Sequence, residues 1–183
     1  MHNGFFNFKN IVGKLFLLLG IVGLLTFSCH TVLANSYVTG ELEGLVIHVA
    51  DGDTITVLTA DNVQHRIRLN GIDAPEKYQA FGGKARQHLD NMVYRKQVTV
   101  TLFGKDKYGR DIGKIATDEY DDVNAIMIQD GFAWHYAQFY PSSEYAALQE
   151  EAQNESLGLW ADPNPIPPWE FRKWKKTQQK RTA

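Results

Sequence analysis

The chain has 183 residues, of which 44% are hydrophobic and 22% charged, enough for one globular domain with a sizeable core. Residues 35–168 hold 11 basic and 20 acidic residues, a net charge of −9, which argues against a protein that binds nucleic acid through a broadly basic surface. An enzyme acting on nucleic acid remains compatible, because it needs positive charge only around the reacting phosphate. The chain has one cysteine, Cys29, which excludes an internal disulfide.

Residues 1–34 are typical of a secretory signal peptide. Lys9 and Lys14 precede an uncharged, leucine-rich run over residues 15–27, and the small and medium residues before Ala34 favour cleavage after it. The run is short for a membrane span, so a retained N-terminal anchor is the less favoured interpretation, and lipidation of Cys29 is another. We therefore expect a mature chain that starts at Asn35 and is secreted or associated with the cell envelope, in the periplasm or outside the cell.

Alternating apolar residues predict five short strands, over residues 42–49, 54–58, 63–69, 98–102 and 112–116. Short turns join the first three strands, which indicates an antiparallel meander. Helical spacing predicts three helices, over residues 84–95, over residues 123–130 with Gly131 as its stop, and from Ser142 to Gly158. This pattern predicts an α+β fold, a five-stranded OB-type β-barrel with three helices, over residues 35–162.

Residues 163–183 differ in composition from the preceding domain. Four prolines over residues 163–168 indicate a stiff spacer, and residues 169–183 then hold six basic residues and one acid. This basic tail is either helical or disordered. It would tether nucleic acid, a membrane or the cell wall as a peripheral envelope contact, or it is simply a solvated end.

Two acidic motifs flank the second and third predicted strands. Asp51 and Asp53 lie in a tight Asp-Gly-Asp turn, and Arg68 near the end of the third strand precedes Asp73 and Glu76 in the following loop. Taken alone, the first motif is a common hairpin turn and an arginine on a strand is usually a solvated residue. If the two loops meet, however, four carboxylates converge, and such a cluster needs a cation such as a divalent metal with oxygen ligands.

These motifs, followed by Asp106-Lys107-Tyr108-Gly109-Arg110, resemble the thermonuclease (staphylococcal nuclease) family in order and spacing, from about Gly44 to Trp160. The resemblance implies an OB-type barrel and a calcium-dependent, sugar-non-specific nuclease. Such an enzyme hydrolyses DNA and RNA and leaves 3′-phosphate ends. We expect a monomer with DNA and RNA as substrates and no obligate protein partner.

The resemblance also implies a metal site. Asp53 and Asp73 would be the carboxylate ligands, and the main-chain carbonyl of Ala74 a third, at a position where the family usually has threonine. Asp51 would hold the turn or act behind the ligands. An all-oxygen set suits Ca²⁺, although the sequence does not exclude magnesium or manganese.

The catalytic residues that the resemblance implies are Arg68, Arg110 and Glu76. The two guanidinium groups would hold the phosphate, since each can meet two oxygens at once. Glu76 is the candidate general base for the attacking water, with orienting that water or bracing Arg68 as alternatives.

The substrate-binding residues that the family positions suggest are Lys107 and Tyr108, for a terminal phosphate, and Tyr136, for stacking a base. The aromatic segment around Tyr136 departs from the family spacing by one residue, and aromatic residues there are often simply packed in the core.

A different class of function remains open, that of a catalytically silent OB-fold module that binds single-stranded nucleic acid or a partner protein. The presence of both arginines together with Asp53, Asp73 and Glu76 favours the enzyme. An extracellular calcium-binding adhesion module would leave the two arginines unexplained.

Overall fold

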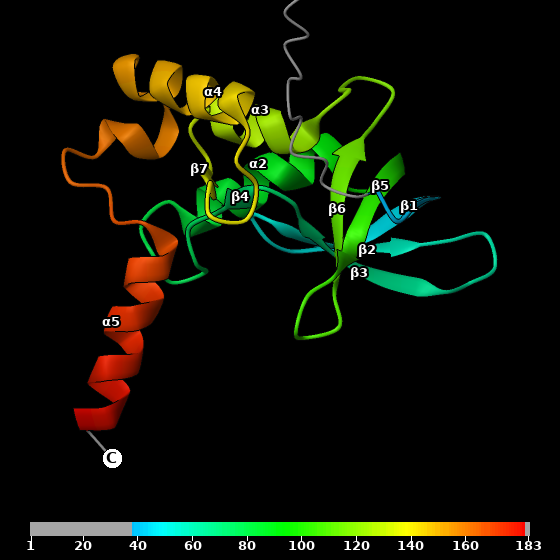
Figure 1. Ribbon diagram of the computed structural model, residues 1–183, viewed down its shortest axis with the longest axis horizontal. Helices are drawn as coiled ribbons and strands as arrows, with labels where there is room; N and C mark the ends of the chain where they lie inside the picture. The colour runs from blue at the N-terminus through cyan, green and yellow to red at the C-terminus, as the bar shows by residue number, and fades with distance from the viewer. Residues whose placement is uncertain (1–37, 182–183) are drawn as a thin grey trace, which may run out of the picture. The chain divides into compact units, whose positions relative to one another are not determined.

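The computed structural model describes residues 38–181 (Figure 1). The expected signal peptide, Cys29 and the cleavage site before Asn35 lie outside the described residues. None of the helices within residues 38–181 combines the length and the apolar character that crossing a membrane requires.

Five strands close into a barrel, as the alternating pattern predicts: β1 (Gly40–Asp51), β2 (Thr54–Leu58), β3 (Gln64–Leu69), β5 (Gln97–Lys105) and β6 (Asp111–Ala116). The predicted meander is confirmed, since β1 pairs antiparallel with β2 and β2 antiparallel with β3. The barrel closes through a parallel pairing of β3 with β6 and antiparallel pairings of β5 with β6 and β1. The β1–β2 turn, the end of β3 and the start of β6 therefore lie at one rim of the barrel.

The three predicted helices are present as α2 (Gly82–Val93), α3 (Val123–Gln129) and α4 (Ser143–Asn154). Asp122 and Ser142 begin α3 and α4 by accepting hydrogen bonds from backbone N–H groups at the third helical positions. A 3₁₀ turn, η1 (Gly158–Ala161), follows α4. The basic tail, for which the sequence allows helix or disorder, adds a fourth helix, α5 (Pro168–Arg181).

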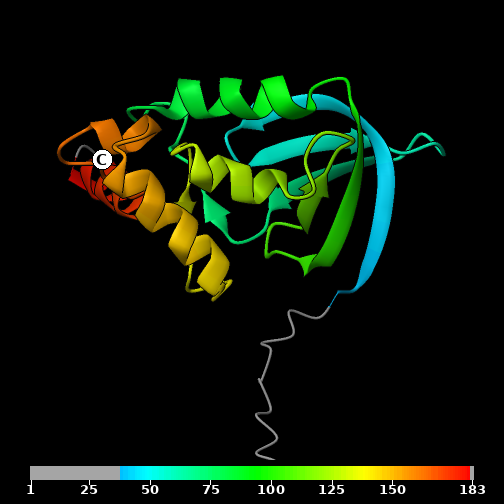
Figure 2. The ribbon, with the colours of Figure 1, turned by 90° about the horizontal axis from the view of Figure 1, so that it is seen from above.

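The core lies inside the barrel and beneath the helices that cover it (Figure 2). Inward-facing residues of the strands alternate with polar ones, so that Val46, Ile55 and Ile67 have no exposed surface. Leu89 of α2 and Met127 of α3 extend this core and are also fully buried. Burial of each such side chain contributes about 1.5–3 kcal/mol, which makes the barrel rim a firm support for the residues it carries.

Two further strands, β4 (Ile72–Asp73) and β7 (Trp134–His135), pair antiparallel in a small sheet of their own. The sequence did not indicate them, because two residues are too few to show an alternating pattern. Their pairing places Asp73 opposite Trp134 and fixes the loop after β3 against the aromatic segment.

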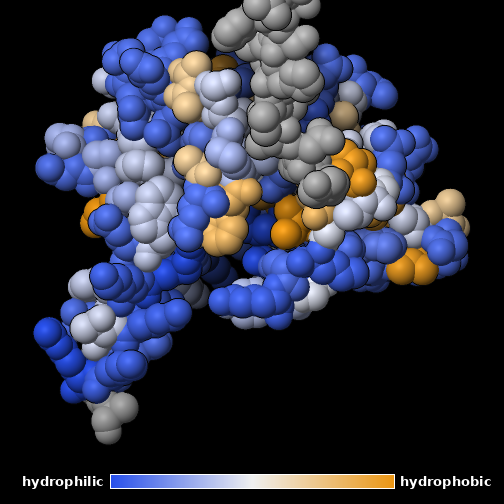
Figure 3. Space-filling view, viewed as in Figure 1, coloured by the Kyte–Doolittle hydropathy of each residue, from blue (hydrophilic) through white to orange (hydrophobic). Residues whose placement is uncertain are grey.

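The helix α5 packs on these same segments through aromatic and backbone contacts. Trp169 stacks on Tyr136 with ring centroids 5.4 Å apart and 3° between the planes, and its ring lies edge-on to Trp134 at 5.6 Å. The side-chain amide of Gln79 donates a hydrogen bond of 2.6 Å to the carbonyl of Ile166. The rest of α5 extends away from these contacts and carries mostly hydrophilic side chains (Figures 1 and 3).

Candidate active site

The two acidic loops meet at the barrel rim. A carboxylate oxygen of Asp53 accepts a hydrogen bond of 2.8 Å from the backbone N–H of Ala74. Gly52 makes this approach feasible, because a Cβ there would lie 2.7 Å from that of Ala74 and 2.8 Å from that of Ala85 in α2. Turn, loop and helix thus touch at a position that only glycine can occupy without displacement.

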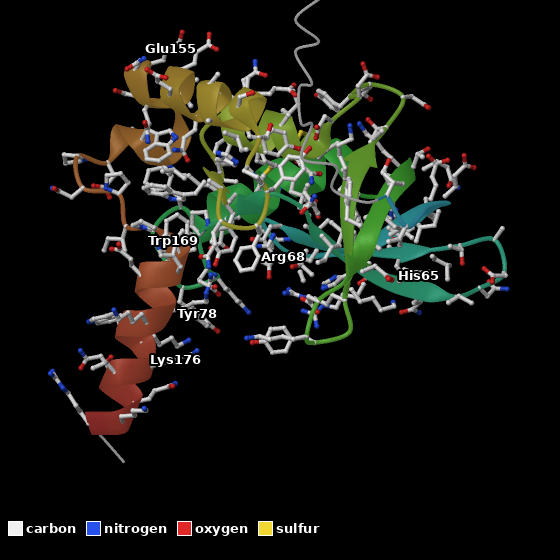
Figure 4. The ribbon with its side chains drawn as sticks, viewed as in Figure 1. His65, Arg68, Tyr78, Glu155, Trp169 and Lys176 are labelled. Atoms are coloured by element: carbon white, nitrogen blue, oxygen red, sulfur yellow. The ribbon has the colours of Figure 1, made fainter. Side chains whose placement is uncertain are left out.

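Arg68 links the two carboxylates that the sequence singles out. Its Nη2 lies 3.1 Å from Oδ2 of Asp53 and 3.0 Å from Oδ1 of Asp73. Its Nη1 donates to the carbonyl of Leu69 at 2.8 Å, which fixes the guanidinium at the end of β3. In Figure 4, Arg68 lies between His65 on the barrel and Trp169 at the start of α5.

Burial disfavours the charged forms of Asp51 and Asp73. Burial raises the pKa of Asp51 to about 6, and the neighbouring negative charge of Asp53 adds to the effect. Asp51 also accepts a hydrogen bond of 3.2 Å from the backbone N–H of Asp53, so it holds the turn. The pKa of Asp73 is raised by burial as well, although the guanidinium groups around it act in the opposite direction. The cluster is therefore one that an added cation would stabilise.

Glu76 lies further along the same loop, against the start of α2. A Cβ on Gly82 would lie only 2.0 Å from the carbonyl oxygen of Glu76, so the first residue of α2 rests directly on this peptide. The backbone N–H of Glu76 donates to the side chain of Gln79 at 3.1 Å. The Glu76 side chain is 41% exposed and is therefore accessible to water and substrate.

Arg110 reaches the cluster from the β5–β6 turn. Its Nε lies 2.7 Å from Oδ2 of Asp106. Burial alone would raise the pKa of Asp106, but hydrogen bonds from Arg110 and Tyr108 outweigh it and lower this pKa below its usual value. Nη1 of Arg110 donates to the Thr54 hydroxyl at 3.4 Å, and that hydroxyl donates to Asp53 at 3.1 Å. Both predicted arginines are therefore connected to the same metal-ligand candidate.

The predicted substrate-binding residues fall into two environments. Lys107 and Tyr108 lie at the tip of the β5–β6 turn, where the Lys107 ammonium lies 5.1 Å from the ring centroid of Tyr108 and that tyrosine is 73% exposed. Tyr136 instead packs between Trp169 and Phe139, with Trp169 covering one face of its ring.

Arg172 of α5 is a site residue that the sequence reasoning missed. Its guanidinium donates to both oxygens of Asp73, at 3.1 and 2.8 Å, and to Oε1 of Glu76 at 2.8 Å. Desolvation would lower the pKa of Arg172, but these two carboxylates outweigh it and raise the pKa. No local motif marks this arginine; the available signal was a basic tail that begins with a tryptophan.

The donor set suits a hard cation, although its carboxylates are paired with guanidinium groups. Within residues 38–181 no group of three or more histidine, cysteine or acidic side chains is arranged to hold a metal ion directly. Asp53 and Asp73 nevertheless share one nitrogen of Arg68, and Arg172 supplies a second positive charge to Asp73. Oxygen donors of this kind are what a hard divalent cation takes as ligands, but in this structure guanidinium groups pair with them.

A barrel rim that carries two arginines beside clustered carboxylates suits the hydrolysis of a phosphodiester, the reaction of a nuclease. The chain belongs to the staphylococcal nuclease homologue family, whose model matches residues 66–162. The family resemblance drawn from the motifs is thereby confirmed. α5, with Arg172, follows the matched residues.

Proteins named as nucleases are among the similar proteins. The chain is 42% identical over 131 residues to an uncharacterized endonuclease of Haemophilus influenzae, covering 72% of this chain and 73% of that protein. It is 40% identical over 144 residues to a micrococcal nuclease of Shigella flexneri, covering 73% and 82%. Protein ParB of Escherichia coli is 42% identical over 144 residues, covering 73% and 80%. These relatives support nuclease activity and hence a nucleic acid substrate.

Proposed function

We propose that this nuclease is a monomeric, calcium-dependent, sugar-non-specific enzyme that is secreted or held in the cell envelope, and that it cleaves DNA and RNA to leave 3′-phosphate ends. The observation that carries the proposal is the placement of Arg68 between Asp53 and Asp73, at 3.1 and 3.0 Å. This arrangement joins a phosphate-binding group to an oxygen-rich cation site. The family resemblance supports the calcium and the product, and the N-terminal composition supports export.

Asp53, Asp73 and the main-chain carbonyl of Ala74 would hold the calcium ion. When bound, calcium neutralises charge on the reacting phosphate and makes a nearby water more acidic. Asp53 and Ala74 are already joined by a 2.8 Å hydrogen bond, which sets the spacing of the two loops.

The remaining steps belong to the protein's own side chains. Arg68 and Arg110 bind the non-bridging phosphate oxygens, on which charge increases as water attacks the phosphorus. Glu76 accepts a proton from that water as the water oxygen bonds to phosphorus. The bond from phosphorus to the 5′ oxygen breaks, that oxygen takes a proton from solvent, and the phosphate stays on the 3′ side. Lys107 and Tyr108 bind a neighbouring terminal phosphate. The pH dependence of turnover in a Glu76→Gln variant distinguishes a Glu76 that takes the proton from one that only orients the water.

A direct test uses the chain from residue 35 with plasmid DNA and with RNA, in calcium or in chelator. We expect cleavage of both in calcium, none in chelator, and products that a polymerase extends only after phosphatase treatment. Asp53→Asn should raise the calcium concentration needed and be partly rescued by more calcium, since it removes a ligand. Asp90→Asn, in α2 and outside the acidic cluster, is the matched control.

Two results would contradict the proposal. Full activity after exhaustive removal of metal would exclude calcium dependence. Binding of single-stranded nucleic acid without any cleavage would favour the silent OB-fold module instead. Mass determination of the exported protein tests the mature N-terminus at Asn35, and a fatty-acylated Cys29 or an uncleaved start would contradict it.

A further inference from the structure

A groove of about 430 Å³ runs from the active site along α5. Glu76 lies at its catalytic end, and its walls include Tyr78 and Tyr108 on the barrel side and Arg172, Lys175 and Lys176 on the helix. Figure 3 shows the hydrophilic surface of the hollow between α5 and the barrel. Its volume lies in the range of ligand-binding pockets, about 300–1,000 Å³.

The groove is basic although the domain around it is acidic. Lys77, Arg172, Lys175 and Lys176 line it, against the single carboxylate of Glu76. Residues 172, 175 and 176 share one face of α5, because side chains three and four positions apart lie together on a helix. Positive charge is thus concentrated in a groove next to the reacting groups, and it would attract a polyanion to them.

The groove also presents two aromatic rings to solvent. Tyr78 is 77% exposed and Tyr108 is 73% exposed. The ammonium of Lys175 lies 5.7 Å from the ring centroid of Tyr78, and in Figure 4 that tyrosine lies beside the first half of α5. Exposed rings alternating with cations are the elements by which proteins bind single-stranded nucleic acid without sequence preference, since bases stack on the rings and cations follow the phosphates.

We propose that this groove binds a single strand of nucleic acid, holding the nucleotides that lie beyond the two joined by the scissile phosphate. The inference rests on the proposed function, because Glu76 is shared by the groove and the catalytic site. Exposed tyrosine rings favour unstacked nucleotides over a duplex, whose bases are not free to stack on tyrosine. Since α5 follows the residues that the family model matches, this wall is an addition to the barrel site.

The contacts of α5 make the wall a fixed one. Trp169 stacks on Tyr136, and Gln79 binds the carbonyl of Ile166, so the start of the helix is attached at two points. Lys175 and Lys176 follow within two turns of Trp169. The helix that carries them is therefore in place before substrate arrives, which reduces the entropy lost on binding.

The test compares two double variants that remove the same charge from the same helix. Lys175→Gln/Lys176→Gln alters the groove, whereas Lys173→Gln/Lys180→Gln alters lysines of α5 that do not line it. Binding of a fluorescent 12-nucleotide single strand is measured by anisotropy in chelator, and KM and kcat are measured in calcium with that strand and with a dinucleotide.

We expect the groove variant to weaken binding of the 12-nucleotide strand about tenfold, to raise its KM similarly, and to leave kcat and the dinucleotide KM unchanged. The slope of log K against log salt should fall by about 1.4, since each phosphate contact on a single strand contributes about 0.7. Tyr78→Ala should also weaken binding about tenfold through lost stacking, with Tyr94→Ala, outside the groove, as its control.

Equal losses in the two lysine variants would overturn the proposal, because bulk charge would then explain them. The proposal would also be overturned if the groove variant lost more binding to a duplex than to the single strand. It would likewise be overturned if the variant lost binding to anionic vesicles but not to nucleic acid. Strand binding that the groove variant weakens, in a protein that cleaves nothing, would support the groove and contradict the proposed enzyme.

Discussion

Arg172 pairs with Asp73 through both oxygens of the carboxylate, at 3.1 and 2.8 Å, although the two residues are 99 positions apart in the chain. The same guanidinium lies 2.8 Å from Glu76. Arg172, a cation from the tail helix, therefore neutralises both Asp73, which we propose as a calcium ligand, and Glu76, which we propose acts on the attacking water. Calcium binding has to proceed in competition with this arginine.

Arg172→Gln should consequently bind calcium more tightly. The guanidinium is 37% exposed, so its ion pair is screened and contributes only about 0.5–1 kcal/mol, which corresponds to about two- to fivefold in affinity. Isothermal titration with calcium, without substrate, measures the change, and Lys173→Gln is the control. Weaker calcium binding in the variant would mean that Arg172 organises the ligands rather than competing with the metal.

Arg68→Lys and Arg110→Lys should each lose most of kcat while the fold and calcium affinity are retained. A planar guanidinium meets two phosphate oxygens together, whereas an ammonium meets them as a single point charge. Loss of one preorganised donor costs about 10²–10³-fold in rate. Arg66→Lys, on the exposed part of β3, is the matched control. Near-wild-type turnover in both site variants would make the active-site assignment wrong.

Gly52→Ala should disturb the site through packing alone. The added methyl group would lie within 2.7–2.8 Å of Ala74 and Ala85 and force the acidic turn away from the loop. We expect a loss of about 1–3 kcal/mol in unfolding free energy, together with weaker calcium binding. Gly83→Ala, where a Cβ meets nothing within 4 Å in α2, should instead be neutral or stabilising. Denaturant unfolding of both variants shows whether the effect of an added methyl group comes from steric contact or from helix propensity.

Asp122 should make stability depend on pH. Burial raises its pKa, although it accepts hydrogen bonds from the Ala125 N–H and the Tyr145 hydroxyl. Because the folded state holds this proton more tightly than the unfolded state, Asp122 adds stability below the ordinary aspartate pKa of 3.8, and this contribution is lost as pH rises through the folded pKa. Measured as wild type minus Asp122→Asn, the unfolding free energy should therefore fall as pH rises above 3.8. A difference that increases with pH would contradict the shift.

The barrel and the meeting of the two acidic loops could be predicted from the sequence, because both depend on local patterns. Ile55 and Ile67 alternate with polar residues. Asp53 comes just before β2 and Asp73 follows β3, and the start of β2 pairs with the end of β3. The contact of Arg172 with Asp73 and Glu76 could not be predicted. It depends on how the proline-rich spacer orients α5 relative to a loop about 100 residues earlier in the chain. The pairing of Ile72 with His135 could not be predicted for a related reason, because so short a strand pair depends on tertiary packing.

The aromatic contacts at the start of α5 give the molecule an intrinsic optical reporter. Trp169 lies edge-on to Trp134, which in turn contacts Trp160 at a centroid distance of 4.3 Å. Emission from this indole cluster depends on whether α5 remains in place, since undocking would expose Trp169 to water. Ultraviolet fluorescence thus follows the position of the tail helix during a calcium or oligonucleotide titration, without any label.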